Sequence, residues 1–283
     1  MSRYNFRRKR GSDSTNFQQE EILIIILCRP DTQRSNRDHL RYYEKIFSDS
    51  NYEVIIFDPN ENDESNDSLG MKKISTTADT DTGRYLDALQ CASTSYPQHN
   101  VLVIRDTVMT SMSPSQIFNI ISLAVRNFDN YHILYLNRNS DYCHRYRTLE
   151  TIDGVRLAIT TSPAGSLAIL YSPTGRDMIL GKTVMASGET FPQYGDIGHN
   201  LTKNIESNNI KALVTDPNVF YFNLSMAAQD SDYIQNNPCR MIEDNSQNTK
   251  TGIYGLLIFI FIVLLLLVIG IGYIFFSKKE KEI

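Results

Sequence analysis

The 283-residue sequence contains no tryptophan and only four cysteines, none of which belongs to a Cys-x-x-Cys pair. Without such pairs the sequence does not predict a zinc site, and the five histidines lack the spacing of metal ligands. The glycines form neither a P-loop nor a dinucleotide-binding fingerprint, and there is no Gly-x-Ser-x-Gly nucleophile turn. The common signatures of P-loop enzymes, dinucleotide-binding enzymes and α/β-hydrolases are therefore excluded.

Acidic residues are missing from the first ten positions, which carry five basic residues. The last seven residues, from Ser277, net +1, so the stretch between must net −10 to give the total charge of −4. A body with this charge does not supply the positive field that nucleic acids need, so we expect no specific nucleic-acid partner. We expect residues 1–20 to form a solvated, disordered basic arm, with contact to anionic lipid or nucleic acid as the alternative.

The longest uncharged segment, residues 252–276, predicts a transmembrane helix. From Ile253 to Phe276 there are 24 residues without a charge. At ~1.5 Å per residue this run extends roughly 36 Å, enough to cross a hydrocarbon core of about 30 Å. Lysines in the short basic tail, residues 277–283, would lie at the lipid headgroups. The expected partner is therefore a lipid bilayer, joined to the rest of the chain by a polar stalk at residues 226–251.

No secretory signal is visible near the N-terminus, because residues 11–21 are polar and the apolar run Ile22–Leu27 is too short. We therefore expect the domain at residues 21–225 to face the cytosol, with the anchor inserted after synthesis. The lysines that follow the anchor favour the opposite orientation. Three Asn-x-Ser/Thr sequons, at Asn66, Asn200 and Asn223, would carry glycans only in that second orientation.

Apolar runs alternate with segments of helical spacing through residues 21–225, which predicts an α/β fold with a mostly parallel sheet flanked by helices. The run Ile22–Leu27 is typical of a strand that is buried on both faces. The other expected strands are 54–57, 101–104, 132–136, 155–160, 167–171, 212–215 and 219–222. Helices are expected at 39–48, 83–93, 173–180 and 199–207, and another should start with Ser113 as N-cap and Pro114 in the first turn.

Ligands of open α/β sheets bind beyond the carboxyl ends of the strands. After the first strand, Arg29, Arg34 and Arg37 could hold a phosphate group through charge-assisted hydrogen bonds. Equally, they could be arginines of a solvated loop. Asp58, at the end of the second strand, is a further candidate for nucleotide binding.

The next strand ends in Arg105-Asp106-Thr107, which gives a second group of candidates. The carboxylate of Asp106 could bind a hard cation, to which Thr107 adds only a neutral oxygen. Asp196, much later in the chain, could supply a catalytic base or a second ligand if the fold brings it close. Alone, a residue of this type is more often a turn residue or a helix N-cap.

Residues 25–34, 101–108, 166–180, 195–199 and 210–219 carry a family resemblance. They resemble, in order, an opening strand with an Arg-containing loop, a strand with a Glu-Asp-Asp metal motif, the strand and helix beside an acceptor site, a late aspartate and a closing strand. These are features of the nucleotide-sugar glycosyltransferases of the A-type fold, especially the lipopolysaccharide and procollagen galactosyltransferases of family 25. The resemblance covers residues 22–223 and implies a glycosyltransferase A-like fold.

Only Asp106, as metal ligand, and Asp196, as catalytic residue, carry over from that family. Where the family has Glu-Asp-Asp, this chain has Arg105, Asp106 and Thr107, so two carboxylates are lost and one cation is gained. A nucleotide-sugar diphosphate needs a divalent ion or an equivalent positive charge on its leaving group. Arg105 could replace the metal charge, or it could simply form an internal ion pair. Mn²⁺ or Mg²⁺ is the cofactor that the resemblance implies for an active protein.

Three functions are compatible with these observations. The degenerate motif favours a membrane-anchored, glycosyltransferase-like protein that has lost catalysis and acts as a structural or interaction module with an unidentified protein partner. The first alternative is an active transferase that uses a nucleotide sugar, and the second is a tail-anchored adaptor with an unrelated α/β fold. A Trp-free composition rich in Asn and Ile is typical of an AT-rich genome and, together with the degenerate motif, indicates a large DNA virus.

Overall fold

The computed structural model describes residues 22–29, 35–47, 52–59, 71–128, 130–141 and 147–222. All of them belong to one compact unit, Met1–Cys239. No helix within these ranges is long and apolar enough to cross a membrane. The predicted basic arm, stalk, transmembrane helix at 252–276 and basic tail lie outside the described residues, so they stay predictions.

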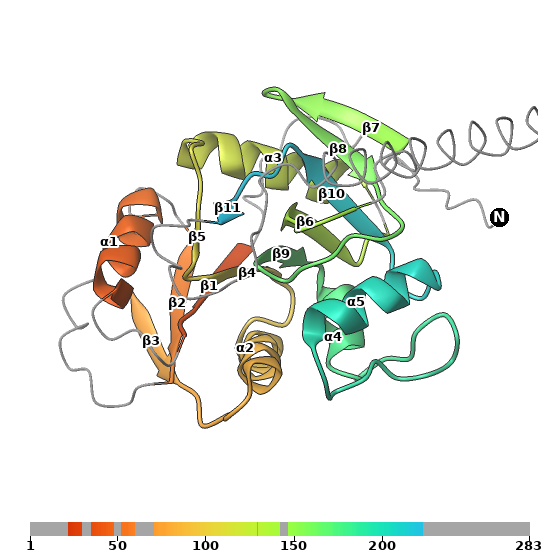
Figure 1. The fold of residues 1–283 in the computed structure, drawn as a ribbon, viewed down its shortest axis with the longest axis horizontal. Coiled ribbons are helices and arrows are strands. Elements are labelled where there is room, and N and C mark those ends of the chain that lie inside the picture. Colours follow the sequence, from red (N-terminus) through yellow and green to blue (C-terminus); the bar gives the residue numbers. More distant parts are fainter. Residues whose placement is uncertain are drawn as a thin grey trace, which may run out of the picture. The chain divides into compact units, whose positions relative to one another are not determined.

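A nine-stranded sheet with the strand order β3-β2-β1-β4-β9-β6-β10-β8-β7 forms the centre of this unit (Figure 1). Two further strands, β5 and β11, form a separate small sheet. The bounds are β1 Ile22–Leu27, β2 Glu53–Asp58, β3 Lys72–Ser75, β4 Asn100–Arg105, β5 Val108–Met109, β6 Ile133–Asn137, β7 Arg147–Ile152, β8 Val155–Ile159, β9 Ala168–Tyr171, β10 Ala212–Asp216 and β11 Tyr221–Phe222.

The sheet is mixed rather than mostly parallel. Strand β1 pairs in parallel with β2 and β4, β2 with β3, and β6 with β10. Every pair that involves β7, β8 or β9 is antiparallel among the named strands. Strand β9 lies between β4 and β6 and is buried along its whole length. An apolar run therefore marks burial on both faces without revealing strand direction, and this is why the sequence overestimated the parallel part.

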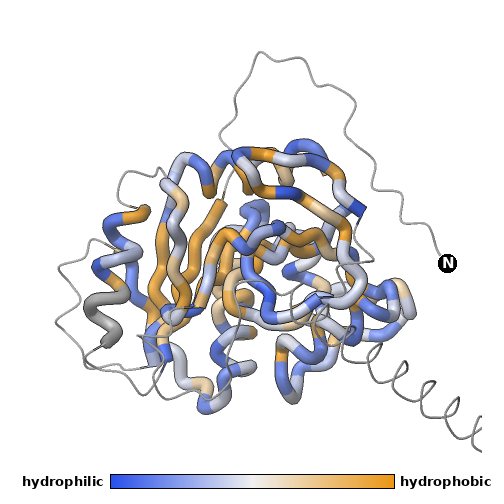
Figure 2. Tube along the Cα trace, turned by 45° about the horizontal axis from the view of Figure 1, so that its top comes forward, coloured by the Kyte–Doolittle hydropathy of each residue, from blue (hydrophilic) through white to orange (hydrophobic). Residues whose placement is uncertain are grey.

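Among the described residues, five helices cover the two faces of the sheet. They are α1 Ser35–Phe47, α2 Asp81–Ser95, α3 Pro114–Asn127, α4 Pro173–Ile179 and α5 Ile197–Glu206. Side chains of β1 alternate between two apolar clusters: Ile24 and Ile26 pack with α1 and α3, whereas Leu23 and Ile25 pack with α2, α4 and α5. Among the residues that Figure 2 colours by hydropathy, the central strands are accordingly strongly hydrophobic.

Local sequence signals predicted the central residues of helices and strands better than the residues at which they begin and end. The Ser113 N-cap of α3 is confirmed and forms a capping box with Gln116. Helices α2 and α5 begin two residues earlier than expected, because Thr80 and Asp196 are their N-caps. Strands β3 and β7 were not predicted. Both lie at the edges of the sheet and expose polar side chains, so they lack the apolar run on which the prediction relied.

Candidate functional site

A cleft of about 570 Å³ opens where β1 and β4 end. Its charged and titratable lining consists of Arg29 after β1, Arg105 at the end of β4, Asp81 in the first turn of α2, and Asp196 and His199 at the start of α5. This is the carboxyl end of the parallel strands, where ligands of open α/β sheets bind. The structure thus brings four of the predicted residues, Arg29, Arg105, Thr107 and Asp196, to one cleft.

The guanidinium of Arg105 is held on several sides. Its Nη1 lies 2.5 Å from Oδ1 of Asp81. Its Nε donates to the carbonyl oxygen of Ser166 at 3.3 Å, and its Nη2 donates to the Ser166 hydroxyl at 3.2 Å. The guanidinium carbon also lies 5.5 Å from the ring centroid of Tyr85, within cation–π range. Because the side chain is only 12% exposed, Arg105 is a fixed cation in the wall of the cleft.

Asp81 is the exposed partner of this ion pair, with 51% of its side chain accessible. Burial raises the pKa of its carboxyl, but the hydrogen bond and charge of Arg105, together with Arg84, outweigh burial and lower the pKa below its usual value. For Arg105, burial lowers the pKa, and Asp81 outweighs it so that the pKa rises. Both groups are therefore ionised at neutral pH.

Asp106, the predicted metal ligand, is 1% exposed and is not one of the described residues that line the cleft. Its Oδ2 accepts the backbone N–H of Arg29 at 3.1 Å, and its Oδ1 lies 3.6 Å from Nε of Arg29. The backbone N–H of Asp106 donates to the carbonyl of Leu27 at 3.0 Å. Asp106 thus ties the end of β4 to the end of β1, while the next residue, Thr107, lines the cleft.

Asp58, at the end of β2, forms an ion pair with Lys73 of β3 at 3.2 Å. Like Asp106, it is not among the described residues of the cleft wall. Both carboxylates act on Cys28, whose thiol pKa is raised first by burial and then by these two charges. Arg34, the remaining predicted donor-site residue, lies outside the described residues.

Asp196 lines the cleft and is also the N-cap of α5, with its Oδ1 accepting the N–H of His199 at 2.6 Å. The preceding Gly195 has φ +77°, a conformation that favours glycine. The carbonyl of Gly195 accepts a 2.6 Å hydrogen bond from the Thr82 hydroxyl, which joins the loop before α5 to the first turn of α2. The N-cap interpretation of Asp196 is confirmed, and its catalytic role stays a prediction.

The cleft residues that the structure describes do not fit a divalent metal ion. Within the described parts of the chain, no group of three or more His, Cys, Asp and Glu residues is placed to hold one. Of the two carboxylates in the cleft, Asp81 pairs with Arg105 and Asp196 caps α5. Hard cations take several oxygen ligands, and the Arg105 guanidinium stands among the oxygens that would have to supply them.

Sequence reasoning missed Asp81 and Ser166. Asp81 had only a local signal, since it follows the N-cap Thr80 and therefore belongs in a first helical turn. Its partner Arg105 was predicted as a site residue, and an internal ion pair was one of the two roles considered for it. The identity of the acid depends on a contact between α2 and β4 that no short-range pattern encodes.

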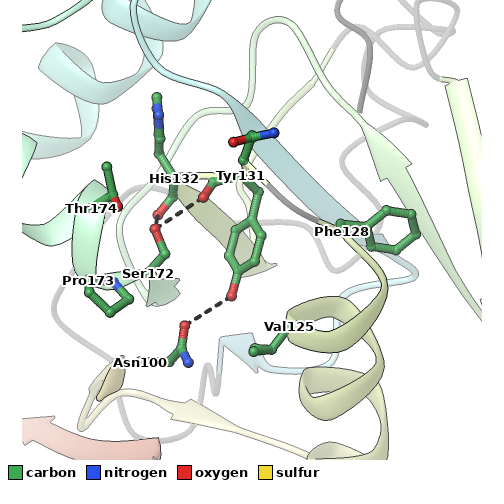
Figure 3. Close-up of a pocket in the computed structure, with 9 residues that line it drawn as sticks. Asn100, Val125, Phe128, Tyr131, His132, Ser172, Pro173 and Thr174 are labelled. Carbon is green, nitrogen blue, oxygen red and sulfur yellow. Dashed lines mark hydrogen bonds between the residues drawn. The ribbon is translucent and has the colours of Figure 1, made fainter. Parts of the chain in front are cut away.

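A second pocket, of about 290 Å³, lies at the opposite ends of the strands (Figure 3). Its Ser172 hydroxyl donates to the carbonyl groups of Tyr131 and His132, each at 3.1 Å. Nδ1 of His132 accepts the N–H of Lys211 at 3.0 Å. Burial, with a smaller effect of the Lys211 charge, lowers the pKa of His132 to about 4. Since the serine hydroxyl is bonded to the backbone rather than to the imidazole, this pocket offers no activated nucleophile.

No protein-family model matches the chain, and no curated protein sequence matches it. Solved structures with a similar fold include a protein named as a nucleotide-diphospho-sugar transferase from Desulfovibrio desulfuricans G20, with 10% identity and a TM-score of 0.43 over 69% of this chain and 79% of that chain. TarS 1–349 from S. aureus has 14% identity and a TM-score of 0.43 over 71% and 60% of the two chains. The mannosyltransferase PcManGT from Pyrobaculum calidifontis, in complex with GDP-Man and Mn²⁺, has 13% identity and a TM-score of 0.45 over 75% and 59%. At these values the comparison describes a likeness in fold alone.

Proposed function

We propose that this chain is a membrane-tethered, glycosyltransferase A-like module that binds a phosphate-containing ligand without a divalent metal and acts in interaction rather than in sugar transfer. The observation that carries the proposal is the ion pair between Arg105 and Asp81 at the end of β4. The family resemblance implies an acidic metal motif at this strand end. Here the strand end supplies a fixed cation instead.

Electrostatics favour an anion over a metal ion beside Arg105. Two like unit charges about 4 Å apart repel by roughly 4 kcal/mol at an effective dielectric constant of about 20, and a divalent ion doubles this repulsion. The same field attracts phosphate, for which guanidinium groups are suited by geometry. Arg29 faces the same cleft and adds to the attraction. A nucleotide sugar or another phosphate ester is the ligand class that we propose.

Thermal unfolding of the full chain in mild detergent tests the proposal, with UDP and GDP added in the presence and absence of Mn²⁺. We expect either nucleotide to raise Tm equally with and without the metal, and Arg105→Gln to abolish the rise. Arg147→Gln is a matched control, because Arg147 is exposed on the edge strand β7, away from the cleft. A rise in Tm that requires Mn²⁺ and disappears in Asp106→Ala would contradict the proposal and favour a metal-dependent enzyme.

An active transferase is the second candidate, because Asp196 lines an open cleft in which it could accept a proton. Asp196→Asn tests this role, since asparagine also caps helices but is not a base. Turnover of a sugar nucleotide that is lost in Asp196→Asn, with the far-UV circular dichroism unchanged, would establish the transferase. If no nucleotide changes Tm and no turnover is found, a tail-anchored adaptor becomes the better hypothesis.

The membrane tether is also a proposal, supported by the uncharged run from Ile253 to Phe276. Alkaline extraction of membranes should leave the full chain in the pellet and release a variant that lacks residues 252–276. Glycans at Asn200 or Asn223 would show that the domain faces the lumen, against the cytosolic orientation that we propose.

A further inference from the structure

Asp81 lies between two arginines. Its Oδ1 is 2.5 Å from Nη1 of Arg105 and 3.6 Å from Nη2 of Arg84, one turn further along α2. Arg84 is fixed as well: its side chain is 11% exposed, and its Nη1 donates to the carbonyl oxygen of Asp79 at 3.4 Å. The carboxylate therefore has two cationic partners, one in the cleft and one on the helix.

The three residues differ in how firmly they are held. Arg105 is bound by Ser166 through Nε and Nη2 and lies against Tyr85, so it stays in place whether or not Asp81 is bound to it. Asp81, with a 51% exposed side chain, can rotate at little cost. It also lies in the first turn of α2, where a negative charge is favourable in either rotamer.

We propose that Asp81 is a displaceable counter-ion: a phosphate group of the bound ligand takes its place on Arg105, and the Asp81 carboxylate turns to Arg84. This inference rests on the proposed function and adds a selection step to it. A ligand must carry enough negative charge to outcompete an attached carboxylate, so a diphosphate should bind while a monocarboxylate of the same size should not. Ligand-free Arg105 is meanwhile screened from other anions.

The affinity of the full chain for inorganic pyrophosphate, measured by titration calorimetry without divalent ions, tests the counter-ion role. Asp81→Asn removes the competing charge, and we expect it to tighten binding at least about tenfold, since like-charge contacts at binding sites cost more than the ~1.4 kcal/mol to which this factor corresponds. Asp79→Asn is the matched control, because Asp79 lies two residues earlier, is exposed, and does not line the cleft. It makes the same change in net charge and should alter the affinity less than about threefold.

Arg84 supplies an independent test. Arg84→Gln removes the second partner of Asp81 and should weaken pyrophosphate binding about threefold to tenfold. In an Asp81→Asn background the same change should have almost no effect on pyrophosphate affinity, because residue 81 then has no carboxylate that could pair with Arg84. If Arg84→Gln weakens binding equally in both backgrounds, Arg84 acts as a general positive charge and the exchange between arginines is wrong.

The two proposals fail in different ways. If the wild-type protein binds pyrophosphate through Arg105 and Asp81→Asn binds no more tightly, the counter-ion role is wrong while the anion site stands. If neither wild type nor Asp81→Asn binds pyrophosphate, UDP or GDP, both proposals are wrong. Binding by Asp81→Asn alone would leave the anion site at Arg105 standing but overturn the displaceable counter-ion, because pyrophosphate would then be unable to displace Asp81 from Arg105.

Discussion

Arg105 and Arg138 are two arginines at strand ends of the same sheet, and their surroundings differ. Arg138 follows β6 and is completely buried, with its Nε 3.2 Å from Oδ2 of the equally buried Asp141 and its Nη2 3.7 Å from Oδ1 of Asp216. Arg105 ends β4, and its acidic partner Asp81 is half exposed. One ion pair is closed to solvent, and the other faces a cleft.

Arg138 belongs to a network of hydrogen bonds among described residues. Asp141 accepts hydrogen bonds from the Thr160 hydroxyl at 2.7 and 2.9 Å. Asn218 accepts the backbone N–H of Arg138 at 3.1 Å and donates to its carbonyl at 3.0 Å. A ligand would have to break this network to reach the guanidinium. The same residue type is thus structural where its acid is buried, and suited to ligand exchange where its acid is half exposed.

Removing the two guanidinium groups should have the most unequal effects. Arg138→Met removes the buried guanidinium that lies 3.2 Å from Asp141, and we expect the free energy of unfolding to fall by about 3–5 kcal/mol. Arg105→Met leaves Asp81 in contact with water and Arg84, so the loss should be about 1 kcal/mol. Urea unfolding followed by far-UV circular dichroism measures both, and the absence of tryptophan makes tyrosine fluorescence the second probe.

Arg156→Met serves as the control for the buried ion pairs of Arg138. Arg156 also pairs with Asp216, but its side chain is 56% exposed, so its loss should cost less than about 1 kcal/mol. If Arg138→Met and Arg105→Met lower the free energy of unfolding equally, the distinction between the buried and the half-exposed ion pair is wrong. Arg105 would then have to be regarded as structural too.

Sequence patterns revealed one of these arginines and not the other. Arg105 follows the apolar run Val101–Ile104, so the rule that ligands bind at strand ends identified it. Arg138 follows a similar run but was not singled out, although its nearer acid, Asp141, lies only three residues later; its other acid, Asp216, lies on β10. Periodicity and apolar runs identify elements that are buried on both faces. They do not identify which charges meet, since that is decided by strand order.

The same limit explains the site. Asp196 could be predicted as an N-cap because capping acts within one turn of helix. The contact of Asp81 with Arg105 depends on where α2 begins relative to the end of β4, and α2 begins two residues earlier than its apolar spacing indicates. Mixed strand direction was equally hidden, because β9 is as apolar as β4 and β6, with which it pairs in antiparallel direction.

The hydroxyl groups bonded to the two ion pairs extend the comparison. Their removal should change the free energy of unfolding by less than removal of the guanidinium groups. Thr160→Val removes the donor to buried Asp141 with little change in shape, so the free energy of unfolding should fall by about 1–3 kcal/mol. Ser166→Ala removes an acceptor from Arg105, but the Ser166 carbonyl still accepts from Nε, so the loss should be about 0.5–1 kcal/mol. Urea unfolding measures both variants. A larger loss of stability for Ser166→Ala than for Thr160→Val would show that the Arg105 ion pair depends more on its hydrogen bonds than the buried Arg138 pair does.

Lowering the pH should give the smallest effect, and this effect is the most specific for the Asp81–Arg105 ion pair. The pKa of Asp81 is lowered in the folded protein, since Arg105 and Arg84 outweigh burial. The ion pair therefore contributes its full stability above the unfolded-state pKa of about 3.9 and loses it as the pH falls through the lower folded-state value. The Tm difference between wild type and Asp81→Asn should be small and constant from about pH 7 to about pH 5, decrease as the pH falls below about 3.9, and vanish only below the folded-state pKa of Asp81. In an Arg105→Gln background most of this difference should already be absent at neutral pH, because the strongest partner of the carboxylate is gone.

A difference that persists unchanged at about pH 3 would mean that Asp81 stabilises the protein by packing rather than by charge, and an uncharged contact could not serve as the counter-ion that a phosphate displaces.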